Sequence, residues 1–143
     1  MVKIVKAKPK DFDTIFVLLK ELYSKDRLVK KKTKEIFLNF IKREDCLSFV
    51  IKKDQIIIGY AAVQIREDIQ SQGKIGYLSE LILNKDFRGK GIGTRLFKEV
   101  IGKSKKAGCR EIQFPSSFPR KKAHKFYLLQ GFQKTAYFFW KEI

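Results

Sequence analysis

The chain has 143 residues and a mass of 16.8 kDa, the size of one ordinary domain, so we expect a single domain over residues 1–143. Hydrophobic residues make up 44% and aromatic residues 13% of the sequence, which is enough for a folded core and excludes a disordered chain. Lysine and arginine total 32 against 15 acidic residues, giving a formal net charge of +17. A field of that strength attracts polyanions such as nucleic acid, an anionic membrane face or a phosphorylated cofactor.

No apolar run approaches the roughly 20 residues needed to span a bilayer, and lysines interrupt the apolar residues of the N-terminal stretch 1–6. We therefore expect a cytoplasmic protein with no membrane partner. Cys46 and Cys109 lie in different segments without CxxC spacing, and His124 is the single histidine. The sequence thus predicts neither a metal site nor a disulfide.

Apolar periodicity and turn signals predict strands that alternate with helices. In chain order we expect a strand at 2–6, a helix at about 12–25, a shorter helix capped by Thr33, strands at 47–51 and 56–65, a polar loop at 66–74, a strand at 76–83, a helix at 94–107, a strand at 111–114, a helix at 120–130 and a strand-like aromatic tail at 132–143. The first helix has an apolar stripe for the core, formed by Phe12, Ile15, Phe16, Leu19, Leu22 and Tyr23. This order predicts an α/β (α+β) fold with a mixed sheet and helices packed on its faces.

The segment between the strand 76–83 and the following helix reads Arg88-Gly89-Lys90-Gly91-Ile92-Gly93-Thr94. Glycines let a backbone turn tightly and present its N–H groups, and the N-terminus of the next helix adds further donors and a positive dipole end. The segment is therefore a candidate pyrophosphate site, and a glycine-rich turn without a ligand is the alternative. Its glycine spacing fits neither a P-loop nor the G-x-G-x-x-G dinucleotide fingerprint.

Two blocks of sequence carry a family resemblance. Arg88-x-x-Gly91-x-Gly93 resembles the R/Q-x-x-G-x-G/A loop of the GNAT superfamily of acyl-CoA-dependent N-acyltransferases. Arg120-x-x-Ala123-His124-Lys125-Phe126-Tyr127-x-x-x-Gly131-Phe132 is similar to a second block found in many small members. The order and spacing of the two blocks fit the family, and the predicted elements fit its fold along nearly the whole chain.

The resemblance implies a mostly antiparallel twisted sheet flanked by about four helices, with a splayed cleft between the strands 76–83 and 111–114. It implies an acetyl-CoA-dependent N-acetyltransferase, of EC 2.3.1 type, with acetyl-CoA as co-substrate and no metal. The pyrophosphate would then lie on the amides of residues 88–94, and the pantetheine arm on the backbone of Leu81, Ile82 and Leu83. Tyr127 matches the tyrosine thought to protonate the departing CoA thiolate, and a core aromatic is the alternative reading.

Direct attack of an amine on the thioester requires removal of a proton from the amine. Glu80 is the acid closest to the expected reacting centre and could accept that proton directly or through water. An exposed strand residue that faces solvent is the alternative, because the bulge expected here hides the direction of the side chain.

The acceptor pocket of such folds lies at the first two helices and their connector, where the carboxylates are Glu21, Asp26 and Glu35. Glu21 and Asp26 could hold an ammonium group. Because a polycationic acceptor conflicts with the charge of +17, a small-molecule or peptide amine with acidic surroundings is favoured. The alternatives are a basic nucleic-acid-binding module, which we rank lower, and an acyltransferase that uses a longer acyl-CoA. The oligomeric state stays open, a homodimer included.

Overall fold

The computed structural model of the protein describes residues 1–24 and 26–143. These residues form two compact units, Met1–Gln113 and Phe114–Ile143, each of which is described by itself. The prediction of one domain over the whole chain therefore stays a prediction. In the part of the chain that the structure describes, no helix is long and apolar enough to cross a membrane.

The first unit contains a five-stranded sheet with the order β1-β2-β3-β4-β5. Its elements are β1 (Val2–Lys6), α1 (Phe12–Leu22), α2 (Lys30–Lys42), β2 (Cys46–Lys53), β3 (Ile56–Asp68), β4 (Gly73–Leu83), α3 (Ile92–Lys106) and β5 (Cys109–Gln113), with short 3-10 turns at Pro9–Asp11 and Lys85–Phe87. The first four strands pair antiparallel, and β5 pairs parallel with β4. The second unit contains one helix, α4 (Lys121–Leu129). The predicted mixed, mostly antiparallel sheet with four helices is confirmed.

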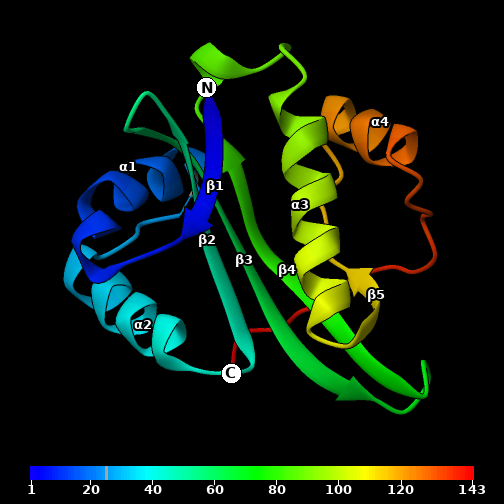
Figure 1. The fold of residues 1–143 in the computed structure, drawn as a ribbon. Helices are drawn as coiled ribbons and strands as arrows, with labels where there is room; N and C mark the ends of the chain where they lie inside the picture. Colours follow the sequence, from blue (N-terminus) through cyan, green and yellow to red (C-terminus); the bar gives the residue numbers. More distant parts are fainter. Residues whose placement is uncertain (25) are drawn as a thin grey trace. The chain divides into compact units, whose positions relative to one another are not determined.

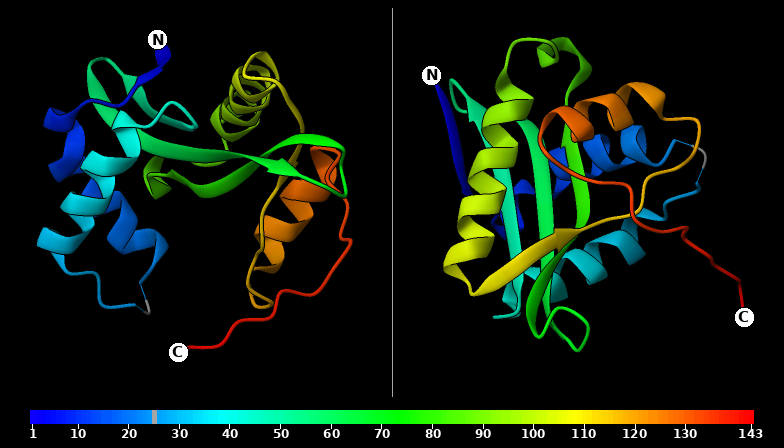
Figure 2. Two further views of the ribbon diagram at one scale, coloured as in Figure 1. Left: turned by 90° about the horizontal axis from the view of Figure 1, so that it is seen from below. Right: turned by 90° about the vertical axis from the view of Figure 1, so that its right-hand side faces the viewer.

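Helices cover both faces of this sheet (Figures 1 and 2), with α1 and α2 on one face and α3 on the other. On the α1 face, buried aromatic and aliphatic side chains of the two helices pack against alternate residues of the strands. This cluster contains Phe12, Ile15, Phe16, Leu18, Leu19 and Phe37 from the helices, and Val50, Tyr60, Ala62 and Ile82 from the strands. Alternation along β4 therefore places Glu80, two residues before Ile82, on the α1 face.

Strand β4 divides into two halves that differ in their pairing. Its first half pairs with β5 from Lys74 to Tyr77, where β5 ends at Gln113. Its second half continues to Leu83 along β3, and in the strand pairing of the described residues it has no partner on its other side. The register with β3 shifts by one residue, since Ala62 pairs with Glu80 and Val63 with Leu78, so that Ser79 forms a β-bulge. The expected bulge is thus present, and the pairing of β4 with β5 stops at Tyr77.

Several predicted boundaries were wrong. The helix predicted to reach residue 25 ends at Leu22, and residue 25 itself lies outside the described residues. Helix α2 begins at Lys30, so Thr33 lies inside it and does not cap it; the Thr33 hydroxyl instead donates to the Val29 carbonyl at 2.9 Å.

The polar stretch 66–74 is mostly strand and not loop. Strand β3 runs to Asp68 and β4 starts at Gly73, because the polar residues of the two strands lie opposite each other. Glu67 pairs in register with Lys74, and the guanidinium of Arg66 lies 5.5 Å from the ring centre of Tyr77. Such cross-strand pairs stabilise a solvated hairpin end.

The aromatic tail 132–143 was predicted to be strand-like, but after α4 the structure has no strand within its described residues. The tail places four aromatic residues in succession, Tyr137 to Trp140, and all four are exposed. Consecutive aromatics lack the alternation that directs one face of a strand into a core, and a strand needs a pairing partner besides β propensity.

Candidate functional site

The glycine-rich loop has the backbone that its sequence predicts. Gly89 and Gly91 adopt φ values of +77° and +78°, in the left-handed region that L side chains rarely enter. Gly91 is the N-cap of α3, and a Cβ built at either glycine meets no heavy atom within 4 Å. The loop therefore leaves open space at a helix N-terminus, where backbone amides at the start of α3 lie outside the intrahelical ladder.

Arg88 is anchored within the protein by three hydrogen bonds. Its backbone N–H donates to the Lys85 carbonyl at 3.3 Å, and its Nε donates to the Leu83 carbonyl at 2.9 Å. Its Nη2 lies 3.1 Å from Oε1 of Glu21, at the end of α1. Arg88 thus fastens the loop to β4 and to α1, and Gly89 contributes the first amide of the loop that can turn toward a ligand.

Glu80 lies beside the bulge of β4, on the face that α1 covers. Its Oε1 accepts a hydrogen bond from the Tyr23 hydroxyl at 3.2 Å, and that hydroxyl is also 3.1 Å from the Ser79 carbonyl oxygen. The Ser79 hydroxyl donates to the Ala62 carbonyl at 3.2 Å, across the bulge. Glu80 therefore faces the α1 end of the sheet and does not extend into bulk solvent.

The surroundings of Glu80 favour its neutral form. Burial raises the pKa of Glu80 above the usual carboxylate value, while hydrogen bonds from Ser79 and Tyr23 partly offset this effect. Burial also raises the pKa of Tyr23, and the nearby Glu80 charge raises it further, so the phenol stays protonated. Within the described residues no salt bridge joins Glu80 to a cation. A carboxylate held in this way is suited to accept a proton.

Two of the three carboxylates predicted at the acceptor side are already paired. Glu21 is bound to Arg88, and Glu35 lies 3.6 Å from the Lys32 ammonium. The backbone N–H of Asp26 donates to the Tyr23 carbonyl at 2.9 Å, which places Asp26 next to the Tyr23–Glu80 pair. Of the predicted set, Asp26 is thus better placed than Glu21 to meet an incoming ammonium group.

Tyr127 lies on α4, in the second unit. Its ring packs edge-to-face on Phe114, with 4.7 Å between ring centres, and lies 6.5 Å from the ring of His124. His124 in turn hydrogen-bonds the Ser116 hydroxyl at 3.0 Å through Nε2. These contacts fix the ring within its own unit, and the predicted role of Tyr127 beside the CoA sulfur stays a prediction.

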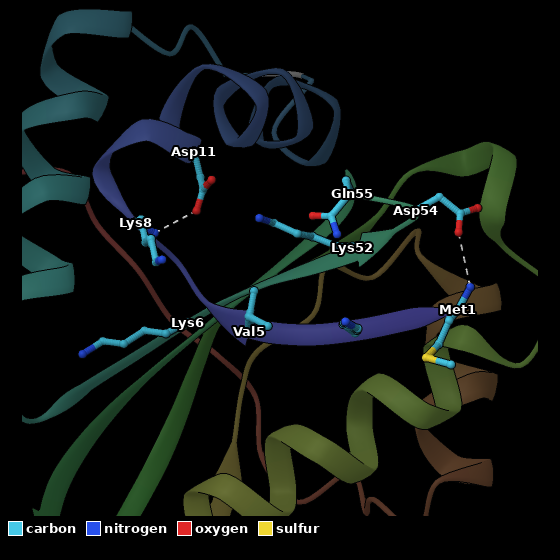
Figure 3. A pocket seen from close by; sticks show the side chains of 9 residues that line it. Met1, Val5, Lys6, Lys8, Asp11, Lys52, Asp54 and Gln55 are labelled. Atoms are coloured by element: carbon cyan, nitrogen blue, oxygen red, sulfur yellow. Dashed lines mark hydrogen bonds and ion pairs between the residues drawn. The ribbon is translucent and has the colours of Figure 1, made fainter.

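A basic groove of about 530 Å³ lies at β1 and the turn between β2 and β3 (Figure 3). Lys3, Lys6, Lys8 and Lys52 line it together with two acids. Both acids already have partners, since Asp11 accepts from the Lys8 backbone N–H at 2.8 Å and Asp54 accepts from the terminal amine at 3.5 Å. The groove has no carboxylate suited to proton transfer, so we place the candidate site at β4 and the glycine loop.

Neither cysteine resembles a nucleophile. Burial raises the pKa of Cys46 to about 11 and raises the pKa of Cys109 as well, so both thiols are protonated at neutral pH. Across residues 1–24 and 26–143, no three histidine, cysteine or acidic side chains are grouped so as to hold a metal ion.

The sequence model of the Acetyltransferase (GNAT) family matches residues 12–132. The chain belongs to this family. An aminoalkylphosphonate N-acetyltransferase of Salmonella typhimurium is 24% identical to this GNAT protein over 87 residues, 61% of this chain and 56% of that protein. The N-alpha-acetyltransferase 30 of Schizosaccharomyces pombe is 29% identical over 113 residues, 78% of this chain and 73% of that protein. The first curated relatives are longer proteins, and the chain spans about half of their length.

A solved structure of an aminoglycoside N-acetyltransferase in complex with CoA superposes on this GNAT chain with a TM-score of 0.89 and 19% identity, covering 100% of this chain and 95% of that one. At that identity the likeness shows the fold. The loop and Glu80 are candidates from sequence, whereas helical spacing places Tyr23 in the core stripe of the first helix. The signal available was a tyrosine at the end of an apolar stripe, since a partly buried hydroxyl needs a hydrogen-bond partner.

Proposed function

We propose that this protein moves the acetyl group of acetyl-CoA to a primary amine by direct attack within a ternary complex. The observation that carries the proposal is the loop at residues 88–94, where two left-handed glycines leave space at the N-terminus of α3. Such a helix end binds the oxygens of a phosphate group, and the charges of Lys90 and Arg95 add to the attraction. The pyrophosphate of CoA supplies the matching anion.

The second half of β4 supports a role for Leu81, Ile82 and Leu83 along the pantetheine arm. An unpaired strand side presents N–H and C=O groups to an amide-containing chain. The Leu83 carbonyl already accepts from Arg88, so we assign the pantetheine contacts mainly to Leu81 and Ile82.

The proposed chemistry uses Glu80 as the base and Tyr127 as the acid. An ammonium group loses one proton to Glu80, directly or through water, and becomes a neutral amine. The amine nitrogen then attacks the thioester carbonyl carbon; the C–N bond forms and the C–S bond breaks. The sulfur takes the phenolic proton of Tyr127, the nitrogen releases its excess proton through solvent to restore the phenol, and Glu80 returns its own proton to solvent.

We further propose that the acceptor amine carries an anionic group. The net charge is +17, and the connector after Tyr23 leads through Arg27 to three successive lysines at the start of α2. In the described residues, Arg27 and Lys31 form no salt bridge, whereas Lys30 and Lys32 are each paired with an acid. The names of two relatives also support an anionic acceptor, since these proteins are named for the acetylation of an aminoalkylphosphonate and of glucosamine 6-phosphate.

A mass-spectrometric acceptor screen with acetyl-CoA tests this proposal. It compares matched amines that differ in one anionic group: 2-aminoethylphosphonate with ethanolamine, and glucosamine 6-phosphate with glucosamine. Acidic and basic N-terminal peptides, a polyamine and an aminoglycoside complete the panel. We expect the anionic member of a pair to be acetylated with a kcat/KM roughly 10-fold higher or more. Preference for a polycation would refute the acceptor class, and failure to acetylate any amine would refute the proposed transfer reaction.

A further inference from the structure

Tyr23 connects the end of α1 to the bulge of β4. It is the C-cap residue of α1, and its hydroxyl oxygen lies 3.1 Å from the Ser79 carbonyl and 3.2 Å from Oε1 of Glu80. Both distances fit hydrogen bonds. One phenol thus faces two acceptors that belong to successive residues of a strand 56 and 57 positions further along the chain.

A phenol has a single proton, so it can donate fully to only one of these acceptors at a time. When Glu80 is ionised, the proton points to the carboxylate and stabilises its charge. When Glu80 is protonated, the carboxyl can donate to the phenol oxygen while the phenol donates to the Ser79 carbonyl. The Tyr23 hydroxyl and the Glu80 carboxyl are thus hydrogen-bonded to each other in both protonation states of Glu80, whereas a purely structural hydrogen bond requires only one.

We propose that Tyr23 is a positioning residue for Glu80, holding the carboxylate toward the α1 face and keeping it hydrogen-bonded before and after it accepts a proton. This inference rests on the proposed role of Glu80 as the base. It adds to the reaction a residue at the end of α1, outside the loop at 88–93 and the block at 120–132 that carry the family motifs.

Hydrogen bonds from Ser79 and Tyr23 both favour the ionised form of Glu80, and Tyr23 is the donor that comes from another element, since the Ser79 hydroxyl also lies 3.2 Å from the Ala62 carbonyl. Burial raises the pKa of Tyr60 on β3, which stays a neutral phenol and is already bonded to the Ser48 hydroxyl at 2.8 Å. Asp26 is the charged neighbour of Tyr23, and it carries the same sign as Glu80. Burial opposes the ionisation of Glu80, so the donated hydrogen bonds must supply the stabilisation of the carboxylate.

Carbon NMR of the protein with isotope-labelled glutamate tests this inference without substrate. Loss of a resonance in Glu80→Gln assigns the Glu80 carboxyl. In Tyr23→Phe we expect its titration midpoint to rise by about 0.5 to 1 pH unit, the effect of losing one donated hydrogen bond. Tyr60→Phe is the matched control, because it removes a buried hydroxyl of the same core that bonds Ser48 and not Glu80. Its midpoint should stay close to that of the wild type.

Kinetics on the fastest amine of the acceptor panel supply the second measurement. In Tyr23→Phe the acid limb of kcat/KM should move to higher pH by the same amount as the NMR midpoint. The variant should cause no further loss in a Glu80→Gln background, since Tyr23 acts through Glu80.

An unchanged or lower NMR midpoint in folded Tyr23→Phe would overturn the inference, as would an equal loss of kcat/KM in both backgrounds. A raised midpoint together with a fully active Glu80→Gln would instead refute the proposed base and leave the hydrogen-bond contact intact.

Discussion

The guanidinium of Arg88 donates to the carboxylate of Glu21 at 3.1 Å, and this ion pair joins the glycine loop to the last turn of α1. Two residues further along, Tyr23 contacts Glu80 on β4. One end of α1 therefore touches both the proposed pyrophosphate loop and the proposed base. Substitutions at this end should affect cofactor binding and proton transfer through separate contacts, which makes the two effects separable by experiment.

Glu21→Gln should tighten the binding of acetyl-CoA by roughly 2- to 5-fold. It removes a negative charge beside the loop and leaves the positive charge of Arg88 uncompensated. The cost in stability should be small, about 1 kcal/mol or less, since both partners of the ion pair are partly exposed. Calorimetry at low and high salt measures the affinity. Glu35→Gln, which loses the exposed pair with Lys32, serves as the control and should leave the affinity unchanged.

Gly91→Glu should abolish the binding of acetyl-CoA, because it adds bulk and a negative charge where the pyrophosphate is proposed to bind. Gly91 has a φ of +78°, so any L side chain there also strains the backbone. Gly91→Ala separates this strain from the added charge, and Gly102→Glu adds the same charge at an unobstructed position further along α3. Normal affinity in Gly91→Glu, measured by calorimetry, would remove the proposed site from the loop.

Tyr127→Phe keeps the aromatic ring on Phe114 and removes only the phenolic proton. We expect nearly unchanged acetyl-CoA affinity and a kcat that falls by about 10- to 1,000-fold, the range for the loss of a general acid. Tyr137→Phe, at an exposed position of the same unit, is the matched control. If chemistry limits the rate and Tyr127→Phe turns over as fast as the wild type, Tyr127 is not the acid.

Glu80→Gln should lower kcat/KM by roughly 100-fold near neutral pH, with a deficit that shrinks as the pH rises toward the pKa of the amine. A free amine then forms without help from the enzyme, so alkaline pH should rescue the variant. Because burial raises the pKa of Glu80, the acid limb of the wild-type profile should lie above the range of an ordinary carboxylate. A loss that is equal at every pH would indicate a positioning role for Glu80, and no loss would place the base elsewhere.

The same variant should be more stable than the wild type at neutral pH. A carboxyl whose pKa is raised on folding binds its proton more tightly in the folded state, so its contribution is favourable at low pH and is lost as the pH rises through the raised pKa. Glutamine is neutral throughout and avoids that loss. Urea unfolding at several pH values should show an advantage for Glu80→Gln near pH 7 that disappears in acid; equal stabilities across the range would contradict a raised pKa.

Features encoded by short stretches of sequence were predictable. The glycine loop follows from local backbone preferences, since Gly89 and Gly91 take conformations that few other residues enter. Strand and helix order followed from apolar periodicity. The prediction of a strand in the tail was wrong because a run of aromatic residues has β propensity but does not determine a pairing partner. The prediction of a loop at 66–74 was wrong because opposite charges in register stabilise strands whose polar sequence resembles a loop.

Long-range contacts of the candidate site were harder to predict from the sequence. Glu80 could be named from its position before the loop, but its direction depended on a one-residue register shift at Ser79. The Tyr23 hydroxyl meets Glu80 across 57 positions of sequence, and helical spacing alone places Tyr23 in the core stripe. The pairing of Glu21 with Arg88 likewise removed a carboxylate that appeared available to an ammonium group.

The turn between β2 and β3 has φ values of 51° at Asp54 and 70° at Gln55, both in the left-handed region without a glycine. A two-residue hairpin of this shape favours Asp-Gly, so Gln55→Gly should raise stability by about 1 kcal/mol. The turn lies at the start of β3, whereas Glu80 on β4 pairs with Ala62 further along that strand. A stabilising substitution is therefore available at this turn. In evolution or in engineering, it could offset destabilising changes at the acceptor side.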